Sequence, residues 1–217
     1  MPRVIFRVRP QFSVRCIRTP TTSRLWRYNF PRRFLERQPA PLIQRLNEIL
    51  AKPDPALGYI NGELRFLLGW AQDIVGDHAA AQETWRLARS ELESFLKDQP
   101  DNFRLNEDLA LNNMGLGNKA DALTLSERAM AANPIEKDAL IAPRSLEILA
   151  RVAAQTGEPD RAIAALQKLL SIPGGGRLRV PLPLTPALLR LDPMFDALRN
   201  DPRFQKLVAS PAPKEAK

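Results

Sequence analysis

The segment LALNNMGLGNKADALTLSERAMAANP, residues 109–134, decides the fold. It predicts two short helices folded back on each other, because Gly117 ends the first helix and the next residue can cap the second. Ala122, Ser126 and Ala129 are spaced i, i+4 and i+7, so they share one face of the second helix. Small residues there let two helix backbones approach closely. We therefore predict a helix hairpin that can stack on a neighbour.

The same unit occurs three times along the chain. Its turn glycines are Gly76, Gly117 and Gly157, and a leucine followed by a small residue lies eight and seven positions before each of them. The other shared positions lie five, nine and twelve residues after the glycine: Ala81, Ala122 and Ala162; Trp85, Ser126 and Leu166; and Ala88, Ala129 and Leu169. Five positions recurring in register predict a helical repeat.

This pattern resembles the tetratricopeptide repeat, whose period is about 34 residues. The turn glycines here are 41 and 40 residues apart, so each interval carries extra residues. An aromatic residue usual near the start of the first helix is missing from all three units. The resemblance covers roughly residues 58–173. It implies an all-α solenoid of stacked antiparallel helix hairpins, in which the first helices line a concave, partner-binding face.

Apolar periodicity and capping residues place the individual helices. A helix over residues 41–52, with an apolar stripe that includes Leu42 and Leu46, stands in for the end of a preceding, degenerate repeat. The three hairpins are expected at 58–75 with 78–98, 102–116 with 119–132, and 137–156 with 159–171.

A second internal repetition lies near the C-terminus. Asp192-Pro193-x-Phe195-x-x-Leu198 recurs nine residues later, from Asp201 to Leu207. Aspartate before proline is a helix start, so each copy predicts a short helix. We expect these helices to cap the solenoid with Phe195, Leu198, Phe204 and Leu207. The string resembles the C-terminal end of repeat domains attached to bacterial Ser/Thr kinases, adenylate cyclases and winged-helix regulators. Residues 210–217 are expected to be a disordered tail.

The N-terminus differs chemically from the rest of the chain. Residues 1–37 hold ten arginines against a single glutamate, a formal charge of +9, while the whole chain carries +8; residues 38–217 therefore carry −1. We divide the chain into a basic, poorly ordered arm (1–38), a repeat domain with its cap (39–209) and the tail. A solvated arm is the favoured interpretation. Alternatives are binding to phosphate or anionic lipid, an organellar presequence, and a stretch unrelated to the domain.

The chain has few residues suited to catalysis, disulfide formation or metal binding. Cys16 and His78 are the single cysteine and the single histidine, which argues against a disulfide framework, a Cys/His zinc site and a nucleophile–histidine pair within the chain. Kinase signatures are missing. We expect no catalytic residues, metal, cofactor or small-molecule substrate. No apolar run approaches the roughly 20 residues of a membrane helix, and a cytoplasmic location is expected unless the N-terminus is a presequence.

The expected function is a non-enzymatic interaction scaffold in bacterial signalling or regulation. The alternative is nucleic-acid or anionic-surface binding through residues 1–37. By spacing, the tetratricopeptide resemblance implies a protein or peptide segment bound on the concave face. Arginines on neighbouring first helices would favour a segment with acidic residues. The implied contact residues are Trp70, Asp73, Arg104, Glu107, Arg144, Glu147 and Arg151.

Overall fold

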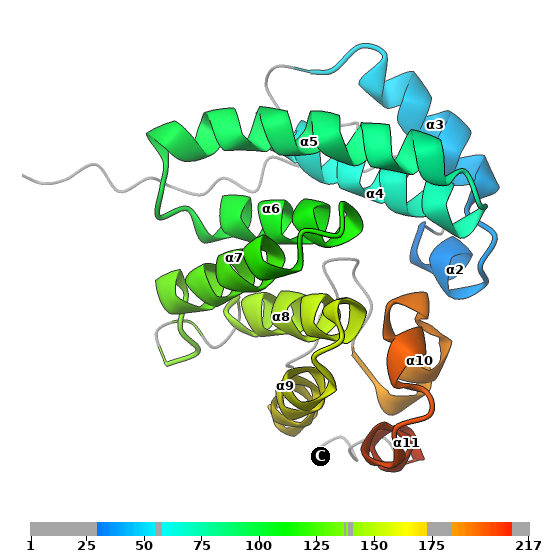
Figure 1. Cartoon of the computed structure of the whole chain (residues 1–217), viewed down its shortest axis with the longest axis vertical. Helices are drawn as coiled ribbons and strands as arrows, with labels where there is room; N and C mark the ends of the chain where they lie inside the picture. Colours follow the sequence, from blue (N-terminus) through cyan, green and yellow to red (C-terminus); the bar gives the residue numbers. More distant parts are fainter. Residues whose placement is uncertain (1–29, 55–57, 137, 139–140, 173–183, 210–217) are drawn as a thin grey trace, which may run out of the picture.

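A computed structural model describes residues 30–54, 58–136, 138, 141–172 and 184–209 (Figure 1). These residues contain helices and no strand. The helices are α2 (Phe30–Leu35), α3 (Ala40–Leu50), α4 (Ile60–Ile74), α5 (His78–Asp98), α6 (Phe103–Gly115), α7 (Lys119–Ala132), α8 (Pro143–Thr156), α9 (Pro159–Ser171), α10 (Pro186–Leu191), the 3-10 helix η2 (Pro193–Leu198) and α11 (Pro202–Ala209).

Consecutive helices pack against each other as a helical solenoid. The hairpins are α4 with α5, α6 with α7, and α8 with α9, and each stacks on the next. The first helices α4, α6 and α8 also contact one another in sequence and form a continuous row, here called the first-helix row (Figure 1). α3 packs against α4 and extends the array by one helix. The predicted all-α solenoid is confirmed.

The three turn glycines share one backbone geometry. Gly76, Gly117 and Gly157 have φ values of 88°, 78° and 83°, in the left-handed region that favours glycine. In each turn the residue after the glycine donates its N–H to a carbonyl five positions earlier, at 2.9 Å. These bonds close a Schellman-type helix end, which satisfies the last carbonyls and reverses the chain.

The repeated small residues are buried in the packed interior of the array. Ala81, Ala122 and Ala162, five residues after the glycines, are fully buried. In the first hairpin, the indole ring of Trp85 contacts both Gly69 of α4 and Gly115 of α6 so closely that a Cβ on either glycine would meet it at 2.4 Å and 2.6 Å. Glycine at these two positions therefore lets one aromatic ring join neighbouring repeats.

Two predicted boundaries differ from the structure. The first helix of the third hairpin begins at Pro143 and not at 137, because proline suits a first helical turn and the preceding chain forms a turn in which Asp138 accepts from the N–H of Ile141. The basic arm does not extend to residue 38. α2 lies within it, and the ring of Phe34 is buried and stacks on Trp70 at 4.1 Å between centroids. Residues 1–29 and the tail 210–217 lie outside the described residues.

The C-terminal helices seal the array as the sequence predicts. Phe195 and Phe204 are buried with side chains of α8 and α9, and their ring centroids lie 6.3 Å apart. Asp192 caps η2 by accepting from the N–H of Met194, although η2 is a 3-10 helix. A further short helix, α10, precedes it. Figure 1 shows α10 on the side of the molecule that also holds α2.

Candidate partner-binding surface

Four of the seven predicted contact residues are partly exposed: Arg144, which pairs with a buried carboxylate, and Trp70, Asp73 and Arg104. Trp70 is half-buried beneath Phe34. Asp73 lies 2.7 Å from Nδ1 of His78, at the turn between α4 and α5. The guanidinium of Arg104 lies over the ring of Phe103, 5.7 Å from its centroid. These three side chains keep part of their surface exposed.

Arg144 and Glu107 form an ion pair between the second and third hairpins. The carboxylate of Glu107 on α6 is fully buried. Its Oε1 accepts from the hydroxyl of Ser145 at 2.7 Å, and its Oε2 lies 3.0 Å from Nε of Arg144, both at the start of α8. Since a buried carboxylate needs compensating partners, this pair fixes how α8 lies on α6.

The last two contact residues are buried under the C-terminal cap. Nε of Arg151 donates to Oε1 of Glu147 at 2.9 Å, one helical turn away. Nη2 of Arg151 lies 2.9 Å from Oδ2 of Asp192, and Nη1 donates to the sulfur of Met194 at 3.0 Å. The guanidinium also lies 5.2 Å from the ring centroid of Phe195. The hydrogen-bonding groups of Arg151 therefore contact α8 and the cap.

Burial shifts the titration of this cluster. Removal from water raises the pKa of Glu147 to about 7, although the nearby charge of Arg151 opposes the rise. Its second oxygen, Oε2, is buried without a hydrogen-bond partner among the described residues, in keeping with that direction. Burial lowers the pKa of Arg151, but the carboxylates of Asp192 and Glu147 outweigh this effect and raise it overall.

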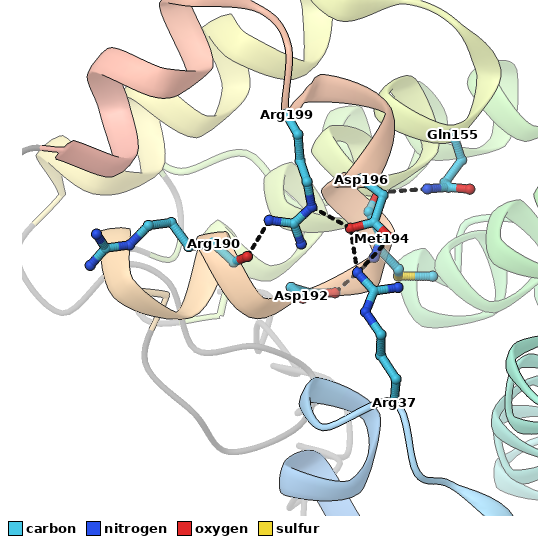
Figure 2. A network of polar contacts seen from close by, with 7 residues as sticks. All are labelled: Arg37, Gln155, Arg190, Asp192, Met194, Asp196 and Arg199. Carbon is cyan, nitrogen blue, oxygen red and sulfur yellow. Dashed lines mark hydrogen bonds and ion pairs between the residues drawn. The ribbon is translucent and has the colours of Figure 1, made fainter.

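The cap is also held by contacts that the sequence did not indicate (Figure 2). The side-chain amide of Gln155, on α8, donates to the carbonyl oxygen of Met194 at 2.7 Å. Nη2 of Arg37, just after α2, lies 2.6 Å from Oδ2 of Asp196. Figure 2 shows the carboxylate of Asp196 between Arg37 and Arg199, whose guanidinium also reaches the carbonyl of Arg190. Segments from both ends of the described chain thus meet beside α8.

The seven residues therefore do not form one exposed wall. The structure pairs the buried Glu107 with the partly exposed Arg144, and it pairs Glu147 with Arg151 in the interior. Their role in binding a partner stays a prediction. Within the described ranges, no three His, Cys, Asp or Glu side chains are placed to hold a metal ion, and no helix is long and apolar enough to cross a bilayer. No protein-family model, curated protein or solved structure matches the chain.

Proposed function

We propose that this chain is a non-enzymatic protein-interaction scaffold of tetratricopeptide type, acting in bacterial signalling or regulation in the cytoplasm. The observation that carries the proposal is the threefold hairpin, with the same glycine turn and the same buried positions in each copy. Such stacking yields an extended surface of regularly spaced side chains, which is the way that helical-repeat proteins bind their partners.

The paired charges of the repeats support a structural and not a chemical role for this face. Glu107, Arg144, Glu147 and Arg151 pair with one another or with the cap. An arginine that bridges two carboxylates is poorly placed as a proton donor, because its charge is stabilised by both. What the repeats present outward is a mixed polar surface in which Arg104 is a cation suited to an acidic partner segment.

The test is capture of a partner by the purified full chain, with identification by mass spectrometry and a repeat measurement with that partner purified. Arg104→Glu should weaken binding several-fold, since an exposed charge contact contributes about 0.2–1 kcal/mol and reversal adds repulsion. Arg86→Glu is the matched control. Arg86 is an exposed arginine on the second helix α5, paired with Glu83, and its reversal should leave the affinity unchanged.

The second candidate function is binding of nucleic acid or an anionic membrane through residues 1–37. The ten arginines of that segment favour it. It predicts that the full chain binds a duplex DNA probe or phosphatidylserine vesicles at low salt, and that the affinity falls steeply as salt rises. A chain starting at residue 30 would then lose binding, while Arg104→Glu would keep it. Retained partner binding in the shortened chain supports the scaffold.

A further inference from the structure

We propose that residues 192–196, Asp-Pro-Met-Phe-Asp, are an intramolecular ligand of the first-helix row. A partner segment of the same chemistry, an aspartate followed two residues later by methionine or leucine and then an aromatic residue, would bind by displacing them. This inference rests on the proposed scaffold function. It names the class of segment that the first-helix row recognises.

The segment is bound through the contacts that recognise extended peptides. Arg151 binds the acidic side chain: its Nη2 lies 2.9 Å from Oδ2 of Asp192. Gln155 binds the main chain by donating to the carbonyl oxygen of Met194. The guanidinium of Arg151 also covers the ring of Phe195. Four residues thus make a charged, a main-chain and an aromatic contact, a combination typical of peptide recognition. A helix cap requires only a side chain that accepts from a backbone N–H of the first turn.

Met194 adds a buried apolar side chain to these contacts. Its buried side chain belongs to one apolar cluster with Phe66 of α4, Leu111 of α6 and Ile148 of α8. That cluster draws side chains from all three hairpins, and Met194 is the member that the returning C-terminal segment supplies. The direct contacts of Met194 are with Arg151 and Gln155 of α8.

The second copy of the motif shows what capping alone looks like. Asp201 accepts from the N–H of Arg203 at 2.8 Å and pairs with the Arg203 side chain, two residues away. Arg203 also pairs with Asp160, at the start of α9. Phe204 is buried against the last hairpin like Phe195. The two copies therefore share a local sequence and a local cap, but Asp192 in addition holds the buried Arg151.

Arg37 indicates that the segment is clamped from outside. It is a residue with a side chain in the left-handed region, φ 56°, a conformation that glycine adopts without penalty. Keeping an arginine there places its guanidinium on Asp196, as Figure 2 shows. Both side chains are about half exposed, so this contact is open to solvent and easily broken. The anchored segment thus has a weak outer clamp beside its buried inner one.

The experiment measures binding of a synthetic peptide with the sequence of residues 190–195, blocked at both ends and fluorescently labelled, to the full chain. Wild type should bind it weakly, because its own segment competes at an effective concentration in the millimolar range. Asp192→Ala should bind it at least tenfold more tightly, since the internal ligand loses its anchor while Arg151 stays in place. Asp201→Ala, which removes the equivalent cap of the second copy, should bind it as weakly as wild type. A peptide with alanine for its aspartate should fail to bind all three.

A second variant protects the test against misfolding. Arg37→Gly keeps the left-handed turn and removes only the exposed clamp, so it should retain the helical spectrum and bind the peptide a few-fold more tightly than wild type. Peptide affinity unchanged in both variants, with the helical spectrum intact, overturns the inference. A purified partner that binds wild type and Asp192→Ala equally, without competition from the peptide, also overturns it but leaves the scaffold function standing.

Discussion

The indole ring of Trp85 occupies the space that a side chain on Gly115 would need. A Cβ at Gly115 would lie 2.6 Å from Cδ2 of the ring, and one at Gly69 would lie 2.4 Å from Nε1, which donates to the carbonyl of Phe66 at 3.3 Å. The ring is rigid and buried, so it cannot yield as a flexible side chain would. The first two hairpins are therefore joined by one tryptophan lying against two glycines.

Gly115→Ala should destabilise the protein by about 1–3 kcal/mol, because overpacking at Trp85 outweighs the gain of helix propensity. Urea unfolding followed by far-UV circular dichroism measures the change. In the background Trp85→Phe, whose ring is smaller, the same substitution should cost less. Equal costs in the two backgrounds would contradict the contact.

Phe34→Ala should destabilise the protein by about 3 kcal/mol, because the buried ring stacks on Trp70 and truncation leaves a cavity. Thermal unfolding of the full chain measures the loss. The matched control is Leu87→Ala on α5, an exposed leucine whose truncation should cost much less. Equal behaviour of the two variants would place α2 outside the folded body.

Phe195→Ala and Phe204→Ala should each cost about 3–5 kcal/mol, because both rings are buried against the last hairpin. The rings lie near each other, so the double variant should lose less than the two single losses combined. The checks are urea unfolding and light scattering, since an uncapped repeat exposes apolar surface and aggregates. Strictly additive losses would show that the rings act independently.

Arg151→Glu should cost about 3–5 kcal/mol, because it leaves the buried carboxylates of Glu147 and Asp192 without their cation. Arg104→Glu, at a partly exposed site, should change stability by no more than about 0.5 kcal/mol. A charge-reversal experiment on the repeats must therefore use Arg104 and avoid Arg151. Similar unfolding midpoints for the two variants would refute the buried network.

The raised pKa of Glu147 predicts a pH dependence of stability. Its carboxyl holds a proton up to pH about 7 in the folded chain, but loses it near 4.5 when unfolded. Between these values the folded state binds more protons, so stability falls as pH rises and levels off above about 7. The slope approaches 1.4 kcal/mol per pH unit at most. Glu147→Gln should flatten the profile between pH 5 and 7; an unchanged slope would assign it to other groups.

The hairpins could be predicted because their causes are local. Gly76, Gly117 and Gly157 mark turns by backbone conformation alone, and the alanines after them mark contacts that only small residues permit. The same reasoning placed both phenylalanines of the cap in the interior. Apolar periodicity, helix capping and residue size act over a few neighbouring residues, so all three can be recognised in the sequence alone.

The buried charges could not be predicted, because their environment comes from distant segments. Helical spacing placed Glu107 and Arg151 on a first-helix face, but α6 lies inside the array and carries a run of buried polar residues, and η2 covers α8. Asp192 had a sufficient local explanation as a helix cap, which hid its contact with Arg151. The burial of these charged side chains depends on which distant segment packs against their helix.

The contact between Arg37 and Asp196 spans 159 positions of the chain. A linear array of repeats has only neighbour-to-neighbour contacts, so its ends can fray one at a time. Here an ion pair links the segment after α2 with η2 across the molecule. Because both side chains are about half exposed, the link is weak: Arg37→Gly should speed amide exchange in α2 and η2 by a few-fold and leave that of α6 unchanged.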